Sequence, residues 1–216
     1  GKISNAKTAF EKALALNPGS AATLSNLGAM AKHAEEWESA LQYFEQALEI
    51  EPDFAEVHYN LGTALKELGR LDEAEARYNQ AILLKPGYAE AYINLGNILR
   101  ELNKPEDASN AYTQAIALKS NHAGVHFNLG ATLTDLGKIE EALDSYKQAI
   151  ALEPNYAEAH FQLGNTFKEL EMLDEAELSY NQAISLKADF VEAYNNLGVI
   201  FSEREKFDDA LESYRH

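Results

Sequence analysis

The sequence contains no cysteine, which excludes disulfide bonds, thiolate nucleophiles and thiolate metal ligands. A chain without disulfides suits a reducing compartment, so a cytoplasmic location is the default expectation. Long hydrophobic runs are also missing. No stretch approaches the roughly 18 apolar residues that span a bilayer, and the first residues lack the apolar core of a signal peptide. We therefore expect no membrane partner.

Basic residues are scarce beside acidic ones. There are 18 Lys and Arg residues against 35 Asp and Glu residues, and the formal net charge is −17. A surface of that sign repels nucleic-acid phosphates, so we expect no nucleic-acid partner. Much of the acidity has a structural explanation, because acidic pairs recur where helices should begin and favour the positive end of the helix dipole. These pairs are Asp72-Glu73, Glu106-Asp107, Glu140-Glu141, Asp174-Glu175 and Asp208-Asp209.

A period of 34 residues runs through the chain, marked by a recurring Leu-Gly pair. The pairs are Leu27-Gly28, Leu61-Gly62, Leu95-Gly96, Leu129-Gly130, Leu163-Gly164 and Leu197-Gly198. Small, aromatic and small residues follow each pair at fixed offsets, for example Ala74, Tyr78 and Ala81. A proline closes most units, at Pro18, Pro52, Pro86 and Pro154, with Ser120 and Ala188 as substitutes.

Each unit is predicted to be an antiparallel pair of helices, because apolar residues recur at helical spacing in both halves. The turn between the halves carries Gly69, Asn103 or Gly137, which tolerate the left-handed conformation that ends a helix. Gly62 lacks bulk and lets the two helices approach closely while Tyr78 fills the space beside them. One hairpin cannot bury its apolar faces alone, so we expect the hairpins to stack.

This signature resembles the tetratricopeptide repeat over essentially the whole chain, which implies an all-α, right-handed superhelical solenoid of antiparallel helix pairs. We expect a single array over residues 1–216. It comprises the second helix of a partial repeat at 1–20, complete repeats at 21–54, 55–88, 89–122, 123–156 and 157–190, and a truncated sixth repeat at 191–216. Such an array is expected to be part of a longer protein, and its uncapped ends predict end-to-end stacking of helix 1–16 on helix 206–216 of another copy.

An amide recurs at the sixth position of the first helices, which lies on the face that lines the concave groove in the family. The residues are Asn26, Asn60, Asn94, Asn128, Gln162 and Asn196. Because an amide both donates and accepts, this row predicts pairing with the backbone of an extended peptide. Alternatively, these side chains bond to neighbouring helices within the stack, or duplication copied them without a use.

Other polar residues of this face are expected to add specificity. They are Asn97 and Asn165 at the ninth position, and Lys32, Lys66, Arg100 and Lys168 at the twelfth. Pro105, Gly124 and Thr134 make the middle of the chain atypical, as either a specificity patch or a drifted copy. The carboxylate clamp of chaperone-tail-binding members needs a lysine at the fifth position. That position instead holds Ser25, Tyr59, Ile93, Phe127, Phe161 and Asn195.

Outside this face, few residues indicate a metal-binding or catalytic site. His122 and His126 have the i, i+4 spacing of a metal pair, but no third ligand accompanies them. His58, His126 and His160 share a packing position, and the lone Trp37 occupies an apolar place in a turn. No phosphate loop or nucleophile elbow appears. We therefore expect no enzyme activity, no cofactor and no metal.

The leading hypothesis is a non-catalytic protein–protein interaction scaffold that binds an extended peptide. Two alternatives stay open. The stretch 59–68 looks like the repeats that precede the catalytic half of O-linked N-acetylglucosamine transferases, and equally like bacterial multi-repeat proteins, which suggests a substrate-docking arm of a larger transferase. The uncapped ends suggest a self-assembling structural module.

Overall fold

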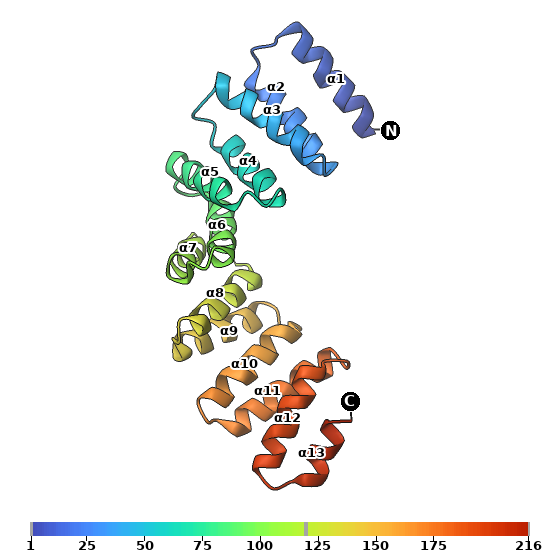
Figure 1. The fold of residues 1–216 in the computed structure, drawn as a ribbon, viewed down its shortest axis with the longest axis vertical. Coiled ribbons are helices and arrows are strands. Elements are labelled where there is room, and N and C mark those ends of the chain that lie inside the picture. Colours follow the sequence, from blue (N-terminus) through green and yellow to red (C-terminus); the bar gives the residue numbers. More distant parts are fainter. Residues whose placement is uncertain (1, 119–120, 216) are drawn as a thin grey trace. The chain divides into compact units, whose positions relative to one another are not determined.

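The computed structural model describes residues 2–118 and 121–215, and in these residues all regular secondary structure is α-helical (Figure 1). Ser120, which was expected in place of a closing proline, lies outside the described residues, as do Gly1, Lys119 and His216. None of the helices in the described ranges combines the length and the hydropathy that a bilayer-crossing segment needs.

The helices alternate between first and second members of a repeat. The first helices are α2 (Ala21–His33), α4 (Ala55–Glu67), α6 (Ala89–Glu101), α8 (Ala123–Asp135), α10 (Ala157–Glu169) and α12 (Val191–Glu203). The second helices are α1 (Lys2–Leu16), α3 (Trp37–Ile50), α5 (Leu71–Leu84), α7 (Pro105–Ala117), α9 (Ile139–Leu152), α11 (Leu173–Leu186) and α13 (Phe207–Ser213). Each first helix packs on the second helix that follows it. The predicted all-α fold of tandem helix pairs is confirmed.

The chain divides into two compact units, Gly1–Leu118 with α1–α7 and Lys119–His216 with α8–α13. In the first unit, each new first helix packs against the preceding second helix, α4 on α3 and α6 on α5. It also contacts the preceding first helix, so α2, α4 and α6 lie in a row, and α8 and α10 do the same in the second unit. The atypical residues Pro105 and Gly124 flank the division.

A glycine facing an aromatic ring sets the close approach of the two helices in a pair. Tyr78 and Tyr180 are fully buried. A Cβ added to Gly62 would lie 3.0 Å from Cδ1 of Tyr78, and one added to Gly164 would lie 2.6 Å from Cε1 of Tyr180. Both distances are too short for a well-packed interior, so the ring occupies the space that the missing side chain leaves. The predicted roles of Gly62 and Tyr78 are confirmed.

The turn between the two helices of a pair contains one left-handed residue. Gly69 (φ 73°), Gly137 (φ 70°) and Asn103 (φ 58°) adopt this conformation, as the sequence predicts. Glutamates adopt it at the same position in other repeats, at Glu35 (φ 59°), Glu171 (φ 59°) and Glu205 (φ 58°). The turn therefore has the same geometry in all of these repeats, whether or not the residue suits it.

Candidate peptide-binding faces

The amide positions form one row in each unit, which we call the amide faces. The first-unit amide face carries Asn26, Asn60 and Asn94 on α2, α4 and α6. The second-unit amide face carries Asn128, Gln162 and Asn196 on α8, α10 and α12. Asn26 is exposed and the other five are half-buried. The row therefore lies at the surface of the helix stack, partly covered by its neighbours.

In the first unit, each of the half-buried amides bonds across a repeat boundary. Lys32 Nζ donates to Oδ1 of Asn60 over 2.6 Å, which joins the end of α2 to α4. Asn94 Nδ2 donates to the hydroxyl of Tyr59 over 3.1 Å, which joins α6 to α4. The opposite ends, the NH₂ of Asn60 and the carbonyl of Asn94, make no hydrogen bond within the described residues. One end of each amide thus serves the stack and the other is available.

In the second unit, the amides form a network centred on Asn165. Asn165 Nδ2 donates to Oε1 of Gln162 over 3.0 Å. Asn165 Oδ1 accepts from the Tyr180 hydroxyl over 2.8 Å and from Asn196 Nδ2 over 2.8 Å. Burial raises the pKa of Tyr180 to about 12, so its hydroxyl stays protonated as the donor. Among described residues, the NH₂ of Gln162 and the carbonyl of Asn196 again remain available.

The remaining predicted site residues are partly engaged by the fold. Asn97 Oδ1 accepts from the Tyr112 hydroxyl over 2.7 Å, and Asn128 also has an interaction partner. Burial lowers the pKa of Lys32. Lys66 Nζ forms an ion pair with Oε1 of its neighbour Glu67 over 2.7 Å, so the positive charge of Lys66 is locally neutralised. Arg100 and Lys168 hold the equivalent position on α6 and α10 and are half-buried.

An aromatic wedge at the fifth position of the first helices was not predicted. The Tyr59 ring lies 5.8 Å from that of Tyr78 in its own repeat and 4.9 Å from that of Tyr88, which precedes the next repeat. Phe127 and Phe161 make the corresponding contacts, with Tyr146 and Tyr156 and with Tyr180 and Phe190. The signal in the sequence was an aromatic residue just before several first helices, at Phe54, Tyr88, Tyr156 and Phe190. The wedge fixes the spacing of the repeats that carry the amides.

His58 and His160 serve the packing of the repeats, and His122 caps a helix. His58 is buried, and its Nε2 donates to the Pro52 carbonyl over 2.8 Å. His160 Nε2 donates likewise to the Pro154 carbonyl over 3.0 Å. His122 Nδ1 instead accepts from the backbone N–H of Gly124 over 3.2 Å at the start of α8. In residues 2–118 and 121–215, no three His, Asp or Glu side chains gather as a metal site would require.

Solved structures with the same architecture include several tetratricopeptide proteins. The chain matches YrrB, described as a TPR protein with an unusual peptide-binding site, with 25% identity and a TM-score of 0.79, covering 86% of this chain and 95% of that one. It matches MamA with 25% identity and a TM-score of 0.70, covering 72% and 91%. PilF of Pseudomonas aeruginosa, at 19% identity and a TM-score of 0.73, covering 89% and 88%, shows the shared fold. A comparison with curated protein sequences found no significant match.

The family match extends over most of the chain. The sequence model of the cilia and flagella-associated protein 70 C-terminal domain, a tetratricopeptide family, matches residues 1–196 of the 216. The repeat signature, the paired helices and this match agree. The chain therefore belongs to the tetratricopeptide repeat family of the cilia and flagella-associated protein 70 C-terminal domain.

Proposed function

We propose that this chain is a protein interaction scaffold whose amide faces each bind an extended peptide segment of a partner. The observation that carries the proposal is that, in the described part of the protein, one end of each of four amide groups is hydrogen-bonded while the other end is not. Asn60, Asn94 and Asn196 bond to a neighbouring first helix through one end of the amide, and Gln162 bonds in the same way to Asn165 of its own helix. Each leaves the other end without a partner among described residues. An available donor on one repeat and an available acceptor on the next match the alternating groups of a peptide backbone.

The aromatic wedges support this proposal because they hold the spacing of the amides. A ligand bound by backbone contacts gains only about 0.5–1.5 kcal/mol per hydrogen bond, so it cannot also order a loose receptor. Tyr59 and Phe161 each pack between a ring of the following second helix and the aromatic N-cap of the next first helix, which fixes the rows before a ligand arrives. The peptide-binding site reported for YrrB, a structural relative with 25% identity, is consistent with this proposal.

Two isosteric substitutions test the proposal without removing a bond from the stack. Asn60→Asp keeps the oxygen that accepts from Lys32, and Gln162→Glu keeps the oxygen that accepts from Asn165. Each removes only the available NH₂ donor. The charge-matched control is Gln46→Glu on α3, which adds the same negative charge at an exposed position on a second helix.

The probes are peptides selected from a random fifteen-residue display library on the intact chain, with affinities measured by calorimetry. We expect Asn60→Asp or Gln162→Glu to weaken binding by about 2-fold to 12-fold, the equivalent of one lost hydrogen bond, while Gln46→Glu leaves it unchanged. Equal affinities for all three variants and the original chain would overturn the proposal.

A further inference from the structure

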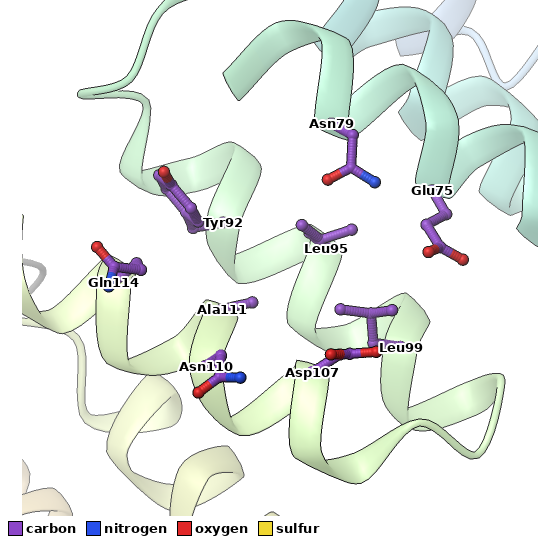
Figure 2. A pocket seen from close by; sticks show the side chains of 9 residues that line it. All are labelled: Glu75, Asn79, Tyr92, Leu95, Leu99, Asp107, Asn110, Ala111 and Gln114. Carbon is purple, nitrogen blue, oxygen red and sulfur yellow. The ribbon is translucent and has the colours of Figure 1, made fainter. Parts of the chain in front are cut away.

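A second kind of surface lies between consecutive second helices, and no amide-face position lines it. In the first unit it is a cavity of ≈ 340 Å³ bounded by α5 and α7. Figure 2 shows Tyr92, Leu95 and Leu99 of α6 between Asn79 on one side and Asp107 on the other. The floor is therefore aromatic and aliphatic, and the rim is polar.

The same groove recurs three repeats later in the second unit, as a cavity of ≈ 220 Å³ bounded by α11 and α13. The lining residues occupy equivalent repeat positions: Asn79 and Asn181, Tyr92 and Tyr194, Leu95 and Leu197, Leu99 and Phe201, Asp107 and Asp209. The two cavities thus arise from one arrangement of side chains and not from an accident of packing in one place.

In two other repeats, the equivalent groove carries a basic side chain of this chain itself. Lys147 of α9 takes the position of Asn79, and its Nζ lies 5.6 Å from the ring centroid of Phe167, the equivalent of Leu99. In the cavity of ≈ 540 Å³ lined by α5, His58 of α4 and the loop that follows α3, Arg77 takes the position of Ala111. A long basic side chain with its stem on the floor and its cation above a ring is a favourable arrangement.

The grooves of Asn79 and Asn181 contain no basic side chain of this chain among their lining residues, and we call them the open grooves. Both have carboxylates at their rims. Asp107 makes no ion pair or hydrogen bond through its side chain within the described residues, although its charge helps to raise the pKa of Lys104, and Asp209 makes none either. The other acid of the first groove, Glu75, is already paired with Lys104 Nζ over 2.8 Å. In the second unit, Lys206 Nζ lies 5.7 Å from the Phe201 ring centroid, but Lys206 does not line the cavity. Each open groove therefore offers a carboxylate beside an apolar floor.

We propose that the grooves of Asn79 and Asn181 each receive an arginine or lysine side chain of a partner protein. The aliphatic stem packs on Tyr92 and Leu95 in one groove, or on their equivalents in the other, and the cation pairs with Asp107 or Asp209. The bound side chain takes the place that Lys147 takes in its own groove. The net charge of −17 favours the approach of a basic partner. This surface is separate from the amide faces.

Amide-resolved NMR titration with a capped Ala-Arg-Ala tripeptide tests the proposal on the full chain. Its control probe is the same tripeptide with citrulline, which has the shape of arginine without the charge. We expect shifts at Asn79, Tyr92 and Leu99, and at Asn181 and Tyr194, with the arginine probe alone. Shifts spread over all acidic helix starts, equal shifts with citrulline, or no shifts would each overturn the proposal.

A reciprocal pair of substitutions at exposed positions makes the test independent of folding defects. Asn79→Lys introduces the lysine that the Lys147 groove contains, and should abolish the shifts around Tyr92 while leaving those around Tyr194 unchanged. Lys147→Asn removes that lysine and should create new shifts around Phe167. Unchanged shifts at Tyr92 in the first variant, or none at Phe167 in the second, would show that the groove position does not control binding.

Discussion

His58 is a buried histidine whose two ring nitrogens have different surroundings. Its Nε2 donates to the Pro52 carbonyl, while its Nδ1 is buried with no hydrogen-bond partner among described residues. A second proton would therefore create a buried donor that no acceptor satisfies. Burial lowers the pKa of His58 below its ordinary value of 6.5, and the positive charge of Arg77 lowers it further.

The lowered pKa of His58 makes stability depend on pH in a stated direction. The unfolded chain takes up a proton near pH 6.5, whereas the folded chain stays neutral until a lower pH. The contribution of His58 to the free energy of unfolding is thus fully present above pH 6.5 and declines as the pH falls toward the folded-state pKa. Tyr92 occupies the equivalent position of the next repeat, so His58→Tyr is a natural replacement. The variant should lose less free energy of unfolding between pH 7.5 and 5.5 than the original chain, by at most about 1.4 kcal/mol.

Urea unfolding of both proteins at the two pH values checks this prediction. Burial also lowers the pKa of His126, but this residue is present in both proteins and its contribution cancels in the difference. An identical loss of stability in His58→Tyr and the original chain would show that His58 does not carry the effect.

The turns between paired helices are elements that tolerate an unsuitable residue. Glu171 is held in the left-handed region at φ 59°, where side chains other than glycine cost of order 1–3 kcal/mol. The turn is closed by hydrogen bonds from the N–H of Glu171 to the Lys168 carbonyl over 3.0 Å and from the N–H of Met172 to the Phe167 carbonyl over 2.9 Å. These bonds, together with packing of the helices, impose the geometry.

We predict that Glu171→Gly stabilises the chain by about 0.5–1 kcal/mol, because glycine adopts this conformation without a Cβ clash. The matched control is Glu169→Gly, two residues earlier at the end of α10, where glycine should destabilise by up to about 1 kcal/mol. Chemical denaturation of both variants measures the two effects. Destabilisation of similar size in both would refute the assignment of strain to this turn.

The helices and turns were largely predictable because they follow from local chemistry repeated in register. The period located the helix pairs, and Gly62 with Tyr78 identified the close contact. The left-handed glutamates were not predictable, since glutamate has no preference for that conformation and the neighbouring helices impose it. The hydrogen-bond partners of the amide side chains could not be predicted from the sequence either. Asn94 bonds to Tyr59 of another repeat, a pairing that depends on how the stack spaces its helices.

At the scale of the whole molecule, the 34-residue period continues through the division between the two compact units. The sequence therefore predicted one array and did not predict the division. Pro105 and Gly124, interpreted as a specificity patch or a drifted copy, lie on either side of it. Each unit has its own amide face and its own open groove, so each unit contains the full set of proposed contacts.

The terminal helices expose apolar side chains, and self-association through them stays a prediction. On α13, Phe207 is 67% exposed and Leu211 is 52% exposed, and on α1 Leu16 is 89% exposed. We expect copies of this 216-residue chain to associate end to end at high concentration, α13 of one on α1 of the next. Leu211→Glu should reduce the average mass in sedimentation equilibrium. Leu178→Glu, at an exposed leucine of α11, should leave it unchanged. A monomer at all concentrations would contradict this expectation.

The groove position of Asn79, Lys147 and Asn181 has an evolutionary consequence. All three side chains are exposed on second helices, so exchanging one for another does not disturb the buried tyrosines and alanines. A tandem array built this way can gain or lose a recognition site by a single codon change in one copy. Its copies are then free to diverge in specificity while the architecture that duplication supplied stays the same.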